Sequence, residues 1–457
     1  MRYNDSEGGE KMVIRKLRKR KFLQNPPKTL AAAFFAMILL GSFLLVLPFS
    51  SMHGVSYIDA LFTATSAVCV TGLTTVTTAT TWTPIGKGII LALIQIGGWG
   101  VMTMATMITM FLGHHIGLSS RRILQSTFNE PALKGMVRML RYILFTSLLI
   151  EGIGAFLLSW VLIPQYGIQR GIAYSIFHSI SSYCNAGFDL FGDSLYPFRN
   201  DPWVLLVISM LIILGGIGFS VYYAIRMRIT KKKRLTLHAK LVLLVTGSLL
   251  LIGTVLFYFL ERNNPMTLGS MSTGEKWLNA FFQSVTTRTA GYYAIRQSAL
   301  RETSALVSML LMFIGGSPAS TAGGIKTTTF VLLVMTMWSE LRGRQDVNIF
   351  RRRIPTPLIR QALSIIIIAL IWIFFATFLL MILYQADSIT AFFEVFSAFG
   401  TVGLTRGLTE KFELFGKCLI ILTMYLGRLG PLTMGYAFAK KKQSPPYREV
   451  EEQILIG

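Results

Sequence analysis

The sequence predicts an all-α integral membrane protein, with eight transmembrane helices and four half-membrane helices in pseudo-fourfold symmetry. Of its 457 residues, 53% are hydrophobic and 14% are charged, whereas an ordinary soluble domain has about 25% charged residues. Eight apolar stretches are long enough to cross a bilayer, which takes about 20 helical residues. Between the members of each successive pair lies a shorter apolar segment that ends in a strip with a glycine.

The eight predicted spans lie near residues 29–49, 85–113, 139–163, 202–225, 237–260, 303–340, 358–384 and 414–439. The first span follows the basic run KLRKRK, as the apolar region of a signal peptide would. However, it is too long for such a region and lacks a clear cleavage site of small residues. We interpret it as a retained span.

The net charge is +23, from 44 Lys+Arg against 21 Asp+Glu. More than half of the basic residues lie in the N-terminal segment and near 114–141, 226–240, 340–353 and 440–448. Cytoplasmic loops are enriched in Lys and Arg, so both termini are predicted to be cytoplasmic and no nucleic-acid binding is expected. Topology explains the runs TKKKR and FRRRIP; binding of an acidic partner or of anionic membrane lipid is the alternative.

The shorter segments form an internal repeat. They read SYIDALFTATSAVCVTGL (56–73), GIAYSIFHSISSYCNAGF (171–188), EKWLNAFFQSVTTRTAGY (275–292) and SITAFFEVFSAFGTVGL (388–404). Each begins as an amphipathic helix and ends in a small, polar strip. Irregular backbone at membrane depth persists only when it is buried in protein or lines a water-filled cavity. Four such strips therefore predict one shared cavity on a pseudo-fourfold axis.

A bare cation in such a cavity needs oxygen ligands, and backbone carbonyls can supply them. The strips contain no acid of the kind that divalent-cation sites use, so a monovalent cation is favoured. A single glycine of this kind would more simply serve helix packing, but its fourfold recurrence favours a selectivity filter. The predicted ion-binding residues are Val70, Thr71, Gly72, Asn185, Ala186, Gly187, Thr289, Ala290, Gly291, Thr401, Val402 and Gly403.

The motifs FTATSAVCVTGL, SVTTRTAGY, GGSPASTAGGIKTTT and GRLGPLT resemble those of the Trk/Ktr/HKT superfamily of potassium transporters, and most those of the bacterial Ktr membrane subunit. The resemblance covers roughly residues 28–440. It implies four M1–P–M2 repeats in one polypeptide, a homodimer with one pore per subunit, and potassium uptake across the plasma membrane. A serine at the first filter glycine goes with sodium preference in this family, so Gly72 points to potassium.

The repeats divide the chain into six predicted parts. These are a cytoplasmic N-terminus (1–28), repeat 1 (29–113), repeat 2 with a cytoplasmic linker (114–225), repeat 3 with a broken second helix (226–340), repeat 4 (341–440) and a cytoplasmic C-terminus (441–457).

The second span of the third repeat carries GGSPASTAGGIKTTT (315–329). Gly and Pro cost about 1 and 3 kcal/mol in a helix interior, so a broken helix with a loop across the pore is predicted. A phosphate loop is disfavoured because GGIKT misses the G-K-[ST] spacing; a passive kink is the remaining alternative. The resemblance implies a gate made of Gly315, Gly316, Ser317, Pro318, Ala319, Ser320, Thr321, Ala322, Gly323, Gly324 and Lys326.

Charged side chains within spans cost about 2.5–3.5 kcal/mol each on insertion scales, so they usually face a cavity or a partner. Arg428 in GRLGPLT is expected to face the pore as an electrostatic barrier, with pairing to Glu151 or to a carbonyl as the alternative. Lys326 is expected to act likewise or to bind carbonyls freed by the broken helix. Asp59 and Glu394 are expected to compensate a helix dipole or to tie down the short helices, with contact to the ion as the alternative. Arg288 is expected to brace the filter, His178 to be a core residue, and His114 and His115 to cap a helix.

No nucleotide-binding motif or catalytic constellation is recognisable, so an enzyme is not expected and no bound cofactor is predicted. Membrane potential supplies about 2.3 kcal/mol per charge per 100 mV. The resemblance implies a cytosolic ring of RCK-type nucleotide-binding subunits, and the terminal PPYREVEEQILIG is a candidate contact for a second subunit or this ring. Sodium as an activator or coupled substrate stays open. The alternatives are a sodium-coupled or sodium-selective transporter and, less favoured, a membrane enzyme or scaffold.

Overall fold

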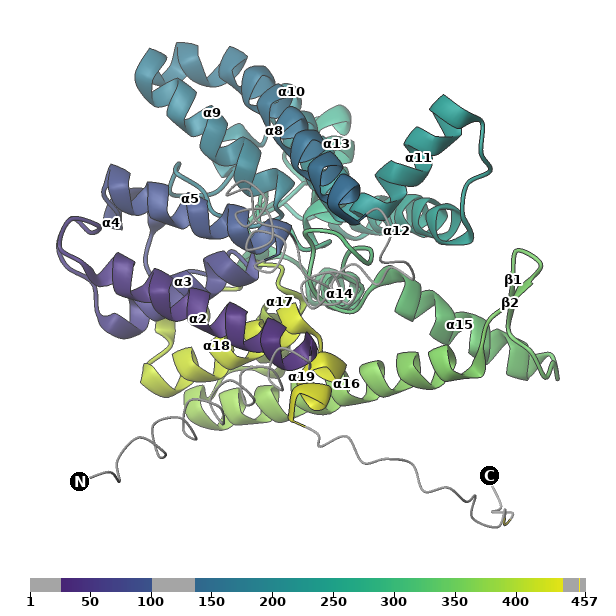
Figure 1. Ribbon diagram of the computed structural model, residues 1–457. Coiled ribbons are helices and arrows are strands. Elements are labelled where there is room, and N and C mark those ends of the chain that lie inside the picture. Colours follow the sequence, from purple (N-terminus) through teal and green to yellow (C-terminus); the bar gives the residue numbers. More distant parts are fainter. Residues whose placement is uncertain (1–25, 101–135, 439–451, 453–457) are drawn as a thin grey trace, which may run out of the picture.

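The computed structural model describes residues 26–100, 136–438 and 452, and nearly all of its regular structure is helical (Figure 1). A hairpin of β1 (Asn348–Ile349) and β2 (Arg352–Arg353) is the only sheet in this part of the chain. The N-terminal basic run, His114, His115 and the segment PPYREVEEQILIG, apart from Glu452, lie outside the described residues.

Four helices are long and apolar enough to cross a membrane among the described residues. They are α2 (Pro26–Val46), α8 (Met136–Tyr166), α12 (Leu237–Glu261) and α16 (Thr356–Tyr384). Each coincides with the first predicted span of a pair. Their outward side chains are large and apolar, as Phe156 and Trp160 on α8 illustrate with 68% and 73% exposure. Such surfaces suit a hydrocarbon solvent.

A short helix follows each long one and stops just before a glycine strip. These helices are α3 (Tyr57–Cys69), α9 (Ile168–Tyr183), α13 (Thr273–Thr286) and α17 (Ser388–Gly400). Three have polar N-caps, of which Ser272 forms a full capping box with Glu275. The C-terminal ends, which carry partial negative charge, are therefore directed at the strips.

A second apolar helix completes each set: α5 (Pro84–Trp99), α10 (Pro202–Ile217), α14 (Glu302–Phe313) and α18 (Leu414–Leu429). All four end before the end of the corresponding predicted span. Three of them end at a glycine with positive φ: Gly100, Gly218 and Gly430. Continuations follow in α11 (Phe219–Lys231), bent by 92° from α10, in α15 (Thr327–Leu341) and in α19 (Pro431–Phe438).

The predictions of uninterrupted spans over 202–225 and 414–439 are therefore wrong, and a broken second helix is not peculiar to the third set. A glycine with positive φ directly after a helix ends that helix without a Cβ clash. In an apolar sequence such a glycine is easily taken for part of a continuous helix. Only α14 and α15 are separated by a long loop, as residues 314–326 lie between them. The part of the predicted span 85–113 beyond residue 100 is outside the described residues.

The helices close into a ring. Each second helix packs on the short helix of the next set, in the pairs α5 with α9, α10 with α13, α14 with α17 and, finally, α18 with α3. The last pair returns the end of the chain to its beginning (Figure 1). Short turns follow the strips: α4 (Thr78–Thr81), η1 (Tyr196–Phe198), η2 (Gln297–Ala299) and η3 (Thr409–Lys411).

Glycines on the second helices allow this packing. A Cβ at Gly97 of α5 would overlap the carbonyl oxygen of Val68 at the end of α3. Gly215 and Gly427 stand in the same relation to Tyr183 and Phe399, at the ends of α9 and α17. Close backbone approach is the main means of tight helix packing in membranes.

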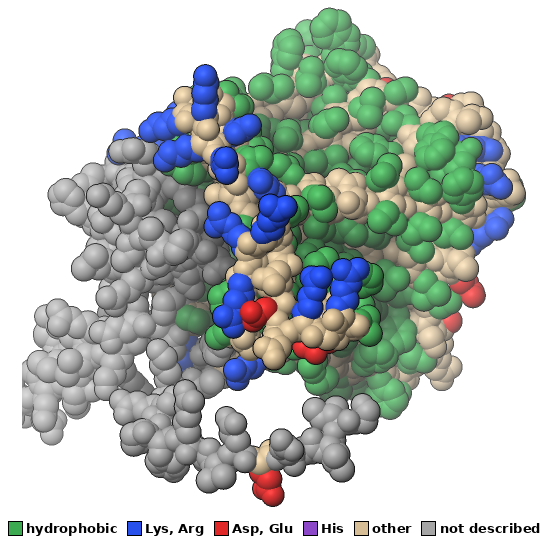
Figure 2. All heavy atoms as spheres, turned by 90° about the vertical axis from the view of Figure 1, so that its right-hand side faces the viewer, with side chains coloured by type: hydrophobic (Ala, Val, Ile, Leu, Met, Phe, Trp, Pro, Cys, Tyr) green, Lys and Arg blue, Asp and Glu red, His purple; other side chains and the backbone are tan. Residues whose placement is uncertain are grey.

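Basic side chains collect at one end of the bundle. Figure 2 shows Lys and Arg side chains over this end, the side of Figure 1 occupied by α11, α15 and the hairpin. The described members are Arg226, Arg228, Lys231, Lys232, Lys233, Arg234, Arg342, Arg344, Arg351, Arg352 and Arg353. They come from the predicted segments 226–240 and 340–353, which share one face.

Gly97→Ala should destabilise the protein by about 1–3 kcal/mol, the usual cost of overpacking, because its Cβ would overlap the Val68 carbonyl. Gly88→Ala, on the same helix with nothing within 4 Å of its Cβ, should be neutral or slightly stabilising. Melting temperatures in detergent measure the difference. Equal melting temperatures for the two variants would contradict this packing role.

Candidate ion-binding site

The four strip glycines lie next to one another in a closed ring. A Cβ at Gly72 would lie 2.5 Å from the carbonyl oxygen of Ala186, which belongs to the following strip. The carbonyls that face Gly72, Gly187, Gly291 and Gly403 are those of Ala186, Ala290, Val402 and Thr71, in that order. Each glycine therefore faces the residue before the next glycine, and the fourth strip meets the first.

The backbone of every strip has the same unusual conformation. Each glycine has a positive φ, between 68° and 96°. The residue two positions earlier is also left-handed, although none of these is a glycine: Val70, Asn185, Thr289 and Thr401. In an extended strand successive carbonyls point to opposite sides, and the two left-handed residues of each strip interrupt that pattern. Such strain in non-glycine residues persists only where the surroundings enforce it.

Side chains of the short helices hold the strips from behind. The hydroxyls of Ser66 and Ser397 accept hydrogen bonds from the Gly72 and Gly403 amides, at 3.0 and 3.1 Å. In the second strip the Ser181 hydroxyl donates instead to the Phe188 carbonyl, at 3.0 Å.

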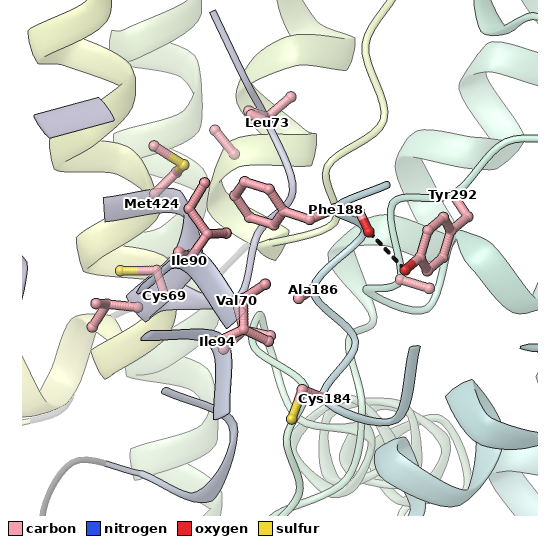
Figure 3. Packing of buried hydrophobic residues seen from close by; sticks show 14 of the residues in the cluster. Cys69, Val70, Leu73, Ile90, Ile94, Cys184, Ala186, Phe188, Tyr292 and Met424 are labelled. Carbon is pink, nitrogen blue, oxygen red and sulfur yellow. Dashed lines mark hydrogen bonds between the residues drawn. The ribbon is translucent and has the colours of Figure 1, made fainter. Parts of the chain in front are cut away.

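The second and third strips are also linked directly. The Tyr292 hydroxyl donates to the Phe188 carbonyl at 2.9 Å (Figure 3). The side chains of Asn185 and Thr289 approach to 3.3 Å. By contrast, the hydroxyls of Thr71 and Thr401 are buried and have no hydrogen-bond partner in the described part of the chain.

A hollow of about 350 Å³ opens beside the ring and is lined by all four strip glycines. Asp189 and Glu410 line the same hollow. The Asp189 carboxylate accepts hydrogen bonds from the amides of Phe191 and Gly192, at 3.0 and 2.6 Å. Burial raises the pKa of this carboxyl, although those amide bonds oppose the shift. No group of three or more His, Cys, Asp or Glu suited to a metal ion occurs among the described residues.

The loop between α14 and α15 lies against the end of α9, against α10 and against the fourth strip. The Thr321 hydroxyl donates to the Tyr183 carbonyl at 3.2 Å, and the Ser317 amide donates to the Gly216 carbonyl at 3.0 Å. A Cβ at Gly323 would overlap the Thr401 hydroxyl. The predicted break and its loop are therefore present, and the loop touches the back of a strip.

Arg428 joins this loop to α5. Its guanidinium donates to the Thr321 carbonyl and, at 2.5 Å, to the Gly97 carbonyl of α5. Of the two alternatives for Arg428, pairing with carbonyls is therefore present, whereas no pair with Glu151 occurs; Glu151 accepts a hydrogen bond from the Gln95 amide at 2.9 Å. Lys326 donates to the Ala322 carbonyl at 2.7 Å, so it binds a carbonyl freed by the broken helix.

The remaining candidates have structural partners. Asp59 pairs with Lys417 of α18 at 2.6 Å. Glu394 accepts hydrogen bonds from the Thr405 and Thr409 hydroxyls and from the amides of residues 406 and 408. The buried His178 accepts from the Leu190 amide at 3.2 Å.

Sequence reasoning missed Lys417, Gln95 and Tyr292. Lys417 is a single cation near the start of a span, and snorkelling would have explained it equally well. Gln95 inside a predicted span was a usable signal, because an amide in hydrocarbon needs a partner.

The fold and this ring define a helical membrane protein with a polar, glycine-lined centre. A family model described as "Cation transport protein" (TrkH) matches residues 15–450, and the chain belongs to that family. The resemblance predicted from the motifs is confirmed.

Several relatives match over most of their length. "Ktr system potassium uptake protein B" of Bacillus subtilis is 45% identical over 92% of this chain and 94% of its own, and the protein of that name in Vibrio alginolyticus is 40% identical over 94% and 95%. "Potassium/sodium uptake protein NtpJ" of Enterococcus hirae is 42% identical over 98% and 100%. The crystal structure of the potassium transporter TrkH from Vibrio parahaemolyticus matches with a TM-score of 0.69 and 18% identity, over 90% of this chain and 83% of that one.

Asp189→Asn should lower cation uptake at low substrate roughly threefold, because a negative charge in a hollow raises the local cation concentration. The raised pKa gives the sign of the pH effect: the wild type should lose uptake as the pH on the side of the hollow falls through it, because the carboxylate becomes neutral. The variant should lack this acid-dependent loss. Rubidium uptake into proteoliposomes, with the pH varied on each side in turn, measures both.

Asp201→Asn is the matched control, since Asp201 caps α10 outside the hollow and Asn caps equally well. If uptake by Asp189→Asn kept the acid dependence of the wild type, the Asp189 carboxylate would not be the group that concentrates cations in the hollow.

Proposed function

We propose that the chain is the pore subunit of a potassium uptake system in the plasma membrane, built from four M1–P–M2 repeats. In this proposal α2, α8, α12 and α16 are the M1 helices, the four short helices are the P helices, and the broken helices are M2. The observation that carries it is the closed ring of glycines and carbonyls. A dehydrated potassium ion would be held there by strip carbonyls, as rings of carbonyls hold it in potassium channels.

Charge supports a monovalent cation. No strip residue is acidic, and two carboxylates, those of Asp189 and Glu410, line the hollow beside the ring. The C-terminal ends of the P helices add partial negative charge without a full charge that would trap the ion. The unpartnered hydroxyls of Thr71 and Thr401 can supply further oxygens.

Gly72 supports potassium over sodium, and three relatives that are 45%, 40% and 35% identical to this chain carry the name of a Ktr potassium uptake system. The name "Potassium/sodium uptake protein" of one relative keeps a sodium-coupled or sodium-selective transporter as the second candidate.

The loop of residues 315–326, with Arg428, is the proposed gate. Arg428 ties Thr321 of the loop to α5, and Gly323 meets the Thr401 hydroxyl of the fourth strip. Neutral carbonyls orient the Arg428 guanidinium without cancelling its positive charge. The electric field of that charge would raise the energy barrier to a permeating cation. If sodium is an activator, we expect it to act by opening this gate.

Regulation would come from outside the chain. We place the basic end of the bundle in the cytoplasm, with both termini, on the positive-inside rule. A homodimer carrying one pore per subunit would dock there on a ring of RCK-type nucleotide-binding subunits. The word "system" in the names of the Ktr relatives fits a multi-component transporter.

Gly72→Ser tests the function. A Cβ at Gly72 would lie 2.5 Å from the Ala186 carbonyl, so the ring must open and selectivity for potassium should fall about tenfold, with sodium then competing for rubidium uptake. The assay uses potassium-starved cells with and without external sodium. Gly54→Ser, at a positive-φ glycine with nothing within 4 Å of its Cβ, is the control. Unchanged selectivity in a well-expressed Gly72→Ser protein would refute the filter.

Arg428→Gln should raise rubidium flux severalfold, because it removes the charge and the link between the loop and α5. Deletion of part of residues 316–323 should act in the same direction. Flux into proteoliposomes at matched protein content measures both. A fall in flux in a folded variant would count against the barrier, and unchanged flux in the deletion variant would count against the gate.

A further inference from the structure

A pocket at the end of α16 brings together three charged side chains that lie outside the ring. Its volume is about 370 Å³, within the usual range of small-ligand sites. Tyr384 and Asp387 line it from the turn between α16 and α17, and Arg406 and Lys411 line it from the segment that follows the fourth strip. None of its lining residues also lines the hollow beside the ring.

Arg406 is held by its backbone but not by its guanidinium. The Arg406 amide donates to the buried Glu394 carboxylate at 3.1 Å. By contrast, the guanidinium atoms Nε and Nη1 are buried and have no hydrogen-bond partner in the described residues, and none of the three ion pairs there includes Arg406. Unmatched donors of a buried charge are costly. An anion in the pocket would supply acceptors, because a guanidinium turned toward it can donate two parallel hydrogen bonds. The exposed Lys411 adds a second positive charge.

The turn between the two helices gives the same pocket a negative charge. One carboxylate oxygen of Asp387 accepts from the Thr390 amide at 2.9 Å and so caps α17, and no ion pair among the described residues includes Asp387. The last carbonyls of α16 add partial negative charge, and the first amides of α17 add partial positive charge. A phosphate alone would meet the Asp387 carboxylate, and an ammonium alone would meet Arg406 and Lys411. The charges therefore match a ligand that carries one anionic and one cationic group.

The pocket lies where the apolar surface of the bundle ends. α16 begins just after the basic hairpin and runs to the opposite end of the bundle (Figure 1). The exposed side chains of its last turns, among them Phe378 and Ile382, are apolar. The Tyr384 hydroxyl accepts from the Glu413 amide at 3.0 Å, so the start of α18, where Phe415 is exposed, lies beside the pocket. A tyrosine at the end of a span is typical of the membrane–water interface, which is the depth of the lipid headgroups.

We propose that the pocket binds the phosphoethanolamine headgroup of a membrane lipid, with the phosphate on Arg406 and Lys411 and the ammonium on Asp387. The acyl chains would lie on the exposed apolar side chains of α16 and α18. An ammonium carries three N–H donors, whereas a choline group has none, and a glycerol headgroup has no positive charge for Asp387. The bound lipid would join the turn between α16 and α17 to the segment after the fourth strip. This site does not depend on the proposed filter.

Native mass spectrometry of the full-length chain in detergent measures the binding of each lipid. Phosphatidylethanolamine should bind roughly tenfold more tightly than phosphatidylglycerol or phosphatidylcholine with the same acyl chains, the gain expected from one charged hydrogen bond. Lys411→Gln should weaken the binding of phosphatidylethanolamine and phosphatidylglycerol alike, and Arg406→Gln should do the same. Asp387→Asn should abolish the preference for phosphatidylethanolamine, because Asn caps a helix equally well but carries no charge. Asp201→Asn, the same change at the cap of α10, is the matched control and should leave the preference intact.

Soluble fragments of the lipid separate a headgroup site from a site for free phosphate. Short-chain phosphatidylethanolamine should raise the melting temperature of the wild type more than that of Lys411→Gln, whereas phosphoethanolamine and inorganic phosphate at the same concentration should raise neither. A rise with inorganic phosphate that Lys411→Gln abolishes would mean that a soluble anion occupies the pocket, and it would overturn the lipid assignment. Equal binding of the three lipids, unchanged in Lys411→Gln and Asp387→Asn, would mean that the pocket holds only water.

Discussion

The close approach of each strip glycine to a carbonyl of the next strip is the contact on which the rest of the structure depends. A Cβ at any of the four positions would meet that carbonyl at 2.6 Å or less, so no other residue permits the ring at this diameter. The approach also requires every strip to be irregular, and irregular backbone at membrane depth needs protein on its outer side. The short helices, the serines that hydrogen-bond to the strips and the surrounding long helices supply that protein.

A second constraint is charge. The described structure holds Arg428 by two neutral carbonyls, those of Thr321 and Gly97. The carboxylate considered as a partner from the sequence, Glu151, accepts a hydrogen bond from the neutral Gln95 amide. A carboxylate partner would cancel the arginine charge, whereas carbonyl partners orient it and leave its field intact. The arrangement therefore suits a barrier better than it suits a structural ion pair.

Much of the fold could be predicted from the sequence, because each repeat has the same order of apolar runs and glycine-containing strips. Four long apolar runs, each followed by a glycine strip, predicted helices close to α2, α8, α12 and α16. The Gly and Pro residues after α14 predicted that the next helix is broken there. The breaks at Gly218 and Gly430 were missed although Gly215 and Gly216 precede the first and Pro431 follows the second. Glycines also serve close packing in continuous membrane helices, and only φ separates the two cases. The partners of Arg428 and Asp59 lie far away in sequence, and contacts at such separations leave no local pattern.

Covalent continuity explains where the ring needs reinforcement. Successive sets are joined by the chain, but the fourth and the first are not, and their junction is made by α18 on α3. There Lys417 pairs with Asp59 at 2.6 Å with both side chains 16% exposed, while the other two described ion pairs are 44–69% exposed. Exposed pairs contribute little, but a sheltered one that also bonds Thr75 can hold two helices in register. A ring of four equal subunits would need the same clasp at every junction; a fused chain needs it at the one junction that the backbone leaves open.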